Sequence, residues 1–429
     1  NQSNLKKLQN LLKEKDTDIF VINRSDEYLN EYISPNAERL NFITNFSGSA
    51  GRAIITPTDA FLYVDGRYTF QANTQINAKE IQAKHLNSFW TDLEKILLEE
   101  EYKIALDPTL HSIIEIEKVE KMLENSTSQL QLIDKNFVDL IWENQPKTQY
   151  TDIFDHPTSF AGQGRSEKLD ILKKFLDQNE IDHYFVSGLD NIAWLLNLRA
   201  DDIKYTPLLY SYLLISKNNK HSLYIKESSM PEILKKEIQT LININNIENI
   251  GSIFNNINSS ESIGLDFNST TFYFLDLLRK QKINTKNLAN PCILLKAIKN
   301  ETELDGAKKA HIRDGVSITK YIYWLKNIMD PKSNDEISVA HHLENLRRKN
   351  ELFHSLSFDT ISAIDKNAAL PHYRVTEEGK SSFSDNNIYL VDSGGQYFDG
   401  TTDITRTIIL GEATTEQKDR FTRVLKGHI

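Results

Sequence analysis

The sequence has a single cysteine, Cys292, among 429 residues. One cysteine cannot form an internal disulfide, which argues against a disulfide-stabilised secreted scaffold and favours a reducing compartment. Cys292 is most simply interpreted as a small buried hydrophobic residue. We therefore expect a protein that folds without covalent cross-links, with the cytoplasm as its default location.

Long apolar runs are also missing. No stretch approaches the roughly 18 consecutive apolar residues of a membrane span. The first residues, Asn1–Lys7, lack the apolar core of a signal peptide, and the chain does not begin with Met, so we expect a trimmed N-terminus, and a removed leader stays open as the alternative to the cytoplasmic default. A membrane partner is not expected.

The chain has fewer positively charged than negatively charged residues. Its 50 Lys and Arg residues face 60 Asp and Glu residues, which gives a formal net charge of −10. An acidic surface disfavours nucleic acid and anionic membranes as partners. It does not argue against a peptide substrate.

What the sequence does have is a repeated alternation of helix and strand patterns. At roughly 150 residues per domain, the length predicts about three domains. We predict an α/β domain over residues 1–155, a second over 156–296 that repeats the same order of elements, and the first part of a third over 297–429. The segment 144–164, with its prolines and glycines, is predicted to be a linker.

Two segments call for a more specific prediction. Residues 243–258 are nearly all Asn and Ile without a helical period, so we expect a loop with short elements there. Asn300 precedes Glu303 by three positions, which predicts a capping box that opens a helix to about Met329. The chain stops inside a further helical pattern at 415–429, as expected for a fragment.

The most informative residues are two aspartates near the C-terminal end. Asp392 ends an apolar strand pattern, where a carboxylate is out of place unless it is paired or binds a cation. Turn signals follow at 394–395 and 399–400, and Asp403 then begins the next strand, eleven positions after Asp392. Two neighbouring strands can bring both carboxylates to one point, and such hard oxygen ligands suit Mn²⁺, Mg²⁺ or Ca²⁺.

Spacing alone leaves three interpretations of this aspartate pair open. A hydrolase with two metal ions needs bridging carboxylates, with the ions roughly 3.5–4 Å apart. The same residues are also compatible with two unrelated aspartates that cap turns, or with a calcium-binding loop.

The segment from Val391 to Thr407 resembles the metal-binding hairpin of the pita-bread metallopeptidases. Within that superfamily it is similar to the aminopeptidase P (Xaa-Pro aminopeptidase) family in its long, three-domain form. This resemblance implies an α/β (α+β) fold with two creatinase-N-like domains followed by a pita-bread catalytic domain, truncated in this chain. The resemblance also covers these segments, in the family's order: Phe46–Gly51, Val64–Tyr68, Ile141–Trp142, Ala193–Arg199, Lys296–Asn300 and Val424–Ile429.

The resemblance implies a site with two metal ions, usually Mn²⁺, held by two aspartates, one histidine and two glutamates. Asp392 and Asp403 match the aspartates, whereas the other three ligands are expected beyond Ile429. His428 matches a helix position that precedes the ligand motif. This chain would then carry two of five ligands and be inactive alone. In the complete protein, a hydroxide shared by the two ions is expected to release the first residue from peptides with proline in second position.

His372, next to Pro371, matches a family histidine that binds substrate and the developing tetrahedral intermediate. A donor aimed at the carbonyl oxygen would stabilise the charge that builds there. The alternative is a surface histidine beside a proline turn. The family strand that lines the same cleft is matched by Ser357–Ile361, which we interpret as pocket wall.

Arg67 has two possible roles. The more direct prediction is a salt bridge with Asp65 inside the first domain. The alternative is that Arg67 binds a substrate terminus across a dimer interface, because the family often forms homodimers through its catalytic domain.

Two rival functions remain. Prolidases cleave Xaa-Pro dipeptides with a similar catalytic domain but have one N-terminal domain, whereas two α/β units precede Lys296 here. Some pita-bread proteins are non-catalytic binding proteins that have lost the metal ligands. The presence of both Asp392 and Asp403 counts against that alternative, because without a metal the two carboxylates would only repel each other.

Overall fold

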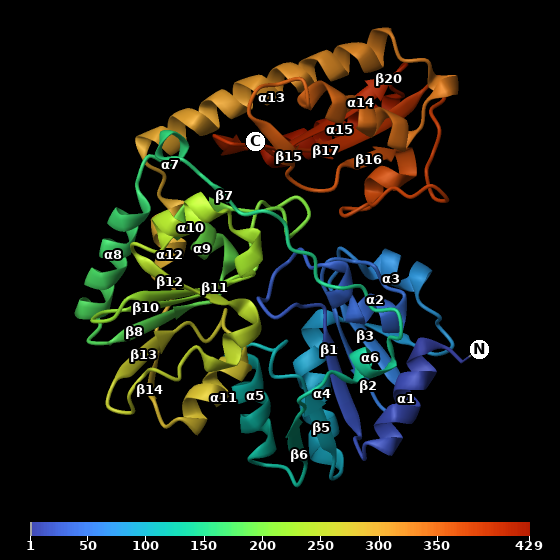
Figure 1. Cartoon of the computed structure of the whole chain (residues 1–429). Coiled ribbons are helices and arrows are strands. Elements are labelled where there is room, and N and C mark those ends of the chain that lie inside the picture. The colour runs from blue at the N-terminus through green and yellow to red at the C-terminus, as the bar shows by residue number, and fades with distance from the viewer. Residues whose placement is uncertain (1) are drawn as a thin grey trace. The chain divides into compact units, whose positions relative to one another are not determined.

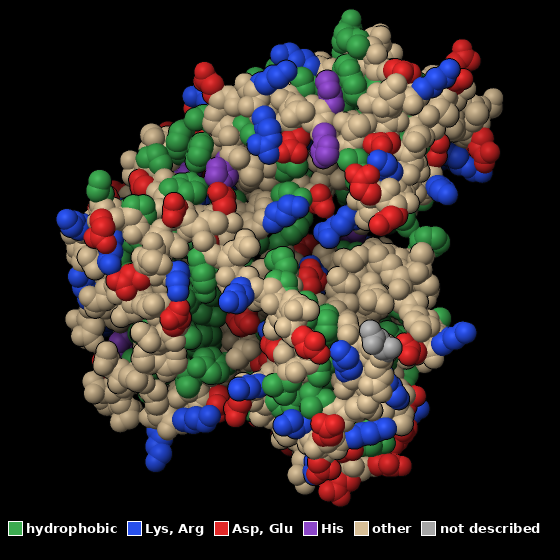
Figure 2. All heavy atoms as spheres, turned by 45° about the vertical axis from the view of Figure 1, so that its right-hand side comes forward, with side chains coloured by type: hydrophobic (Ala, Val, Ile, Leu, Met, Phe, Trp, Pro, Cys, Tyr) green, Lys and Arg blue, Asp and Glu red, His purple; other side chains and the backbone are tan. Residues whose placement is uncertain are grey.

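The computed structural model describes residues 2–429 and separates into two compact units, the first ending at Lys299 and the second beginning at Asn300 (Figure 1). The first unit contains two six-stranded sheets, and the second contains two three-stranded sheets. Over residues 2–429, no helix is both long enough and apolar enough to cross a bilayer. Figure 2 shows acidic and basic side chains interspersed over the visible face.

The first sheet of the N-terminal unit has the strand order β4-β3-β2-β1-β5-β6. Strand β2 pairs antiparallel with both β1 and β3, and the remaining neighbours pair in parallel. All five residues of β1 are buried, as expected for a central strand covered on both faces. The strands are β1 (Ile19–Asn23), β2 (Arg52–Ile55), β3 (Ala60–Val64), β4 (Gln82–His85), β5 (Lys103–Leu106) and β6 (Gln129–Leu132).

The second sheet has the same topology as the first. Its order is β12-β11-β10-β8-β13-β14, with β10 antiparallel to β8 and β11 and the other neighbours parallel. The prediction that the second domain repeats the order of elements of the first is thus confirmed. The strands are β8 (His183–Val186), β10 (Tyr212–Ser216), β11 (His221–Ile225), β12 (Ile242–Asn246), β13 (Ser262–Leu265) and β14 (Asn284–Asn287).

Helices connect the strands of each sheet. The first, α1, begins where Ser3 caps it by accepting a hydrogen bond from the Lys6 amide, and it buries Leu5, Leu8 and Leu12 at helical spacing. The helices around the first sheet are α1 (Asn4–Glu14), α2 (Arg39–Thr44), α3 (Thr69–Gln75), α4 (Phe89–Glu99), α5 (Ile113–Leu123) and α6 (Phe137–Ile141). Those around the second are α8 (Arg165–Gln178), α9 (Leu189–Leu196), α10 (Glu232–Ile238), α11 (Phe272–Lys280) and α12 (Pro291–Ala297).

One hydrophobic core joins the two sheets inside the first unit. It includes Ile19 and Ile104 of the first sheet together with Phe185 and Leu265 of the second. Helices α5 and α11 lie side by side between the sheets (Figure 1). The Ile113 amide at the start of α5 donates to the Thr270 carbonyl at 3.0 Å. The two sheets therefore pack as one body.

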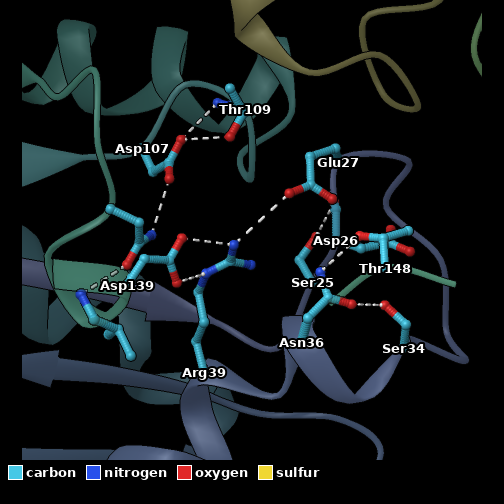
Figure 3. A network of polar contacts seen from close by, with 12 residues as sticks. Ser25, Asp26, Glu27, Ser34, Asn36, Arg39, Asp107, Thr109, Asp139 and Thr148 are labelled. Carbon is cyan, nitrogen blue, oxygen red and sulfur yellow. Dashed lines mark hydrogen bonds and ion pairs between the residues drawn. The ribbon is translucent and has the colours of Figure 1, made fainter. Parts of the chain in front are cut away.

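A buried arginine ties helices α2 and α6 of the first unit together (Figure 3). Arg39 is 5% exposed and donates through Nε and Nη2 to both carboxylate oxygens of Asp139, at 2.8 and 2.9 Å. Glu27 approaches the same guanidinium at 3.7 Å. Paired and hydrogen-bonded in this way, the charge is stable in a buried position.

The second unit begins with two helices that cover its strands. Asn300 and Glu303 form the predicted capping box at the start of α13 (Glu301–Asn327). The helix α14 (Glu336–Arg347) packs against α13 and β16. The last helix, α15 (Thr415–His428), has no buried residue in this structure.

Two small sheets complete the second unit. The orders are β15-β18-β19 and β16-β17-β20. The core of the unit lies between the helices and the second of these sheets and includes Tyr321 and Leu343 on the helices and Tyr389, Val391 and Ile408 on the strands. The strands are β15 (Phe353–Leu356), β16 (Ile361–Ile364), β17 (Asn387–Ser393), β18 (Gly395–Tyr397), β19 (Gly400–Thr401) and β20 (Ile404–Leu410).

One local prediction is confirmed and another needs correction. The Asn- and Ile-rich stretch 243–258 was expected to be a loop with short elements, and it contains the last part of the edge strand β12, which pairs in parallel with β11, followed by the 3₁₀ helix Ile247–Ser252. The predicted linker 144–164 contains a helix, α7 (Thr158–Ala161), and a strand, β7 (Phe154–Asp155), which pairs with β9 (Leu198–Arg199). Cys292 is buried and not disulfide-bonded, as expected.

Candidate metal centre

Strand β17 presents Asp392 on the face opposite to the core. Burial alternates along the strand, with Tyr389 and Val391 fully buried on one face and Asp392 half-buried on the other. Asp392 lies opposite Thr405 in the antiparallel pairing with β20, and the Thr405 hydroxyl donates to Asp392 Oδ1 at 2.7 Å. This hydrogen bond orients the Asp392 carboxylate.

The structure brings Asp403 beside Asp392. Asp403 directly precedes β20, and the register pairs Ser393 with Ile404, so both carboxylates stand at the same end of the strand pair. Burial raises the pKa of Asp403, and the negative charge of Asp392 and a hydrogen bond between the two side chains raise it further. Two carboxylates that repel each other in this way would be stabilised by a shared cation.

A set of short contacts holds the hairpin between the two aspartates in shape. The Thr402 hydroxyl accepts a hydrogen bond from the Gly395 amide at 2.9 Å, and the Thr402 carbonyl accepts one from the Ser357 hydroxyl at 2.8 Å. The Ser357 amide also donates to the Gly394 carbonyl at 3.1 Å. Ser357, which the sequence suggested as pocket wall, thus has a role in holding the hairpin.

Gly394 allows the closest approach within this hairpin. A Cβ atom at this position would stand 1.9 Å from the Thr402 carbonyl oxygen and 2.2 Å from Ser357 Oγ. No side-chain rotation removes a clash with a backbone oxygen. Any larger residue must therefore push the two strands apart.

Gly394→Ala is expected to destabilise the second unit by about 2 kcal/mol, because overpacking of this kind costs roughly 1–3 kcal/mol. The measurement is the guanidinium midpoint of the unfolding transition of this unit. Gly315→Ala is the matched control: Gly315 lies inside α13 with nothing within 4 Å of the added Cβ. That change should stabilise the helix by roughly 0.5–1 kcal/mol. Equal midpoints for the two variants would contradict the steric explanation.

His372 lies in the same unit on a different segment. It is half-buried in the loop that follows the 3₁₀ helix Asp365–Ala369. The structure shows a turn here, closed by the Tyr373 amide, which donates to the Leu370 carbonyl at 3.1 Å. His372 therefore lies on a loop, whereas the two aspartates belong to a strand pair.

Arg67 belongs to the first unit. Its guanidinium donates through Nε and Nη2 to the two oxygens of Asp65, at 2.9 and 2.7 Å. The Arg67 side chain is still half exposed. The salt bridge predicted from the sequence is present, and it orients an accessible guanidinium.

Among residues 2–429, no three His, Cys, Asp or Glu side chains are close enough together to hold a metal ion. The chemistry of Asp392 and Asp403 nevertheless fits a divalent cation, because both are hard oxygen donors that stand together and repel each other. Two carboxylates alone do not complete a coordination shell for such an ion.

Models of known families match nearly the whole chain. Residues 4–135 and 144–303 each match a creatinase/prolidase N-terminal domain, and residues 305–429 match metallopeptidase family M24. A probable Xaa-Pro aminopeptidase P from Paracoccidioides brasiliensis is 34% identical over 447 residues, covering 99% of this chain and 72% of that protein. The chain belongs to the Xaa-Pro aminopeptidase P family. A second relative, from Neosartorya fischeri, is 36% identical over 99% of this chain and 67% of its own length.

A solved structure from this family has the same fold. The X-prolyl aminopeptidase from Caenorhabditis elegans, described as a cytosolic enzyme with a dinuclear active site, superposes with a TM-score of 0.90 at 27% identity. The match covers 96% of this chain and 70% of that protein. Two creatinase-N-like domains followed by a pita-bread M24 domain are therefore confirmed as the fold class of this aminopeptidase P family member.

Sequence reasoning missed two polar residues of this region. Thr405, which orients Asp392, could have been found from strand register, because it is the residue opposite Asp392 in the hairpin. Glu336, which lies under the loop that carries His372, has no comparable signal, since its partners are 28 to 45 positions away.

Proposed function

We propose that the full-length protein is a metal-dependent Xaa-Pro aminopeptidase, which removes the N-terminal residue from peptides with proline in second position. The observation that carries this proposal is the meeting of Asp392 and Asp403 at one end of the β17–β20 pair, in a chain of this family. The organisation into domains 1–155, 156–296 and 297–429 is part of the proposal.

Asp392 and Asp403 would hold two divalent cations, with Mn²⁺ proposed and other divalent ions as alternatives. A histidine and two glutamates that complete the site are proposed to lie beyond Ile429. When bound, the cations would lower the pKa of a water molecule and polarise the scissile carbonyl. Thr405 keeps Asp392 in a fixed orientation for this purpose.

His372 is proposed to donate a hydrogen bond to the carbonyl oxygen of the first residue as negative charge builds on it. The leaving nitrogen belongs to proline and carries no hydrogen, so a site that relies on that N–H would lose a contact. A pocket shaped for the pyrrolidine ring gains apolar burial instead. Arg67, oriented by Asp65, is proposed as a contact for a substrate terminus in a homodimer.

The rival functions are distinguishable. A prolidase-like enzyme would prefer Xaa-Pro dipeptides, and a non-catalytic pita-bread protein would bind no metal. The cytoplasm is the proposed location, supported by the buried, unpaired Cys292 and by the cytosolic description of the nematode relative.

The test is hydrolysis of Arg-Pro-Pro by the purified full-length protein, together with its metal content. We expect about two metal ions per chain and release of the first arginine. Arg-Ala-Pro and the dipeptide Arg-Pro are the matched control substrates, and both should be cleaved poorly. Preferential cleavage of Arg-Pro would favour a prolidase, whereas absence of both metal and cleavage would favour a binding protein.

A further inference from the structure

A buried carboxylate stands beneath the loop that carries His372. Glu336, the first residue of α14, is 0% exposed, and none of its contacts in residues 2–429 is an ion pair with Lys, Arg or His. A buried carboxylate without a cation must be satisfied by hydrogen bonds, because its desolvation otherwise costs several kcal/mol. The groups that donate to it are Ile364 N (2.6 Å), Asn367 Nδ2 (2.9 Å), Tyr373 Oη (2.8 Å) and Ser381 N (2.8 Å).

These donors come from both ends and from the interior of one loop. Ile364 ends β16 just before the loop, and Ser381 follows it. The Ser381 carbonyl in turn accepts a hydrogen bond from the Glu336 amide at 3.2 Å. An ion pair between Lys380 and Asp335, at 2.9 Å, lies next to these hydrogen bonds. The start of α14 therefore clamps the segment 364–381 at its base.

Tyr373 connects this clamp to His372. Its amide closes the turn that contains His372 by donating to the Leu370 carbonyl at 3.1 Å, and its hydroxyl donates to Glu336 Oε2 at 2.8 Å. Burial raises the pKa of Tyr373, and the hydrogen bond to Glu336 and the charge of that carboxylate raise it further. The hydroxyl thus remains a protonated donor over the whole physiological pH range.

We propose that Glu336 is a positioning residue, which through Tyr373 fixes the loop that presents the His372 imidazole to the substrate. This inference rests on the proposed function. Its physical basis is that misplacement of a reacting group by about 1 Å can cost on the order of 100-fold in rate. Glu336 itself touches neither substrate nor metal in this scheme.

The test is a double-mutant cycle on the metal-loaded full-length protein with Arg-Pro-Pro as substrate. Tyr373→Phe removes the hydroxyl that reaches Glu336 and is expected to lower kcat about tenfold with little change in KM. His372→Ala is expected to lower kcat about 100-fold. The double variant should be no slower than His372→Ala alone, because the anchor has no effect once the imidazole is absent.

Tyr321→Phe is the matched control. It also deletes one buried tyrosine hydroxyl bond of the same unit, the 2.8 Å contact between Tyr321 and Tyr389, but it leaves the loop untouched. Its kcat should equal that of the wild type. A purely structural role for Tyr373 would give the two variants equal effects on stability and on rate.

Hydrogen exchange provides a readout that does not depend on activity. Glu336→Gln removes an acceptor from a site with four donors, so exchange over 365–381 should become faster while the α13 core remains protected. Unchanged exchange there, wild-type kcat in Tyr373→Phe, or additive losses in the double variant would each overturn the positioning role while leaving the proposed function intact. Absence of cleavage by the wild type would overturn both.

Discussion

Asp403→Asn in the full-length protein is expected to abolish tight metal binding and to lower kcat/KM on Arg-Pro-Pro by on the order of 1000-fold. The substitution keeps the size of the side chain and removes its charge. The proposed site then has one anionic oxygen ligand fewer, just before the start of β20, and a neutral amide oxygen is a much weaker partner for a divalent cation. The measurements are metal content after dialysis and steady-state kinetics.

The metal-free form of the same variant provides an internal check. Because burial and, next, the charge of Asp392 raise the pKa of Asp403, the ionised form of this side chain opposes folding at neutral pH when no cation is present. This destabilisation is complete above the raised pKa of Asp403. It disappears as the pH falls below the pKa that the same carboxyl has in the unfolded chain. Without metal, Asp403→Asn should therefore not lower the thermal midpoint, whereas with metal it should.

Asp385→Asn is the matched control for this prediction. It is the same chemical change at an exposed position of the same unit, in the turn that precedes β17. Metal content and kcat/KM should both stay at wild-type values. Full activity and metal content in Asp403→Asn would refute the assignment of this residue as a ligand.

Arg347→Met is expected to destabilise the second unit by about 3–5 kcal/mol, the usual result of removing one partner from a buried ion pair. Arg347 and Asp314 are both 0% exposed, and Arg347 donates through Nε and Nη2 to the two oxygens of Asp314, at 2.6 and 3.0 Å. The Tyr397 hydroxyl also donates to Asp314, at 2.8 Å. Without the arginine, α13 would bury a carboxylate that lacks a counter-charge.

The neighbouring Arg348→Met is the control for this loss. Arg348 is paired with Glu344 on the exposed side of α14, and such pairs contribute less than about 1 kcal/mol. Denaturant unfolding of both variants gives the comparison. Adding Asp314→Leu to Arg347→Met should recover part of the stability, because the pair is then replaced by apolar side chains. Similar losses of unfolding free energy for Arg347→Met and Arg348→Met would show that the buried pair contributes no more to stability than the exposed pair.

The buried pair also matters for the site. Tyr397 is part of β18, so Asp314 of α13 and Arg347 of α14 connect these two helices to the hairpin that carries Asp392 and Asp403. Asp399 in the same hairpin pairs with Arg313 of α13, and its backbone carbonyl approaches Gly306 so closely that a Cβ there would stand 2.2 Å away. The hairpin is therefore held from the helix side, away from the face on which Asp392 lies.

The sequence by itself determined the local helices and strands and the residues whose side chains can bind a metal ion. An apolar run predicted the strand that ends at Asp392, the Asn300–Glu303 pair predicted the start of α13, and the two aspartates around glycine turns indicated a metal site. These features can be predicted from the sequence because hydrophobic periodicity, helix caps and turns depend on residues within a few positions of each other. Family resemblance supplied the fold class.

Only the tertiary structure decided the contacts between distant segments. The register of β17 and β20 placed Asp392 opposite Thr405, and packing brought Glu336 beneath a loop that ends 45 positions later. Pairing with β11 also placed the first residues of the Asn-rich segment in the edge strand β12. Such contacts depend on which faces become buried together. A hydrophobic pattern specifies that a face is buried, but it does not specify its partner.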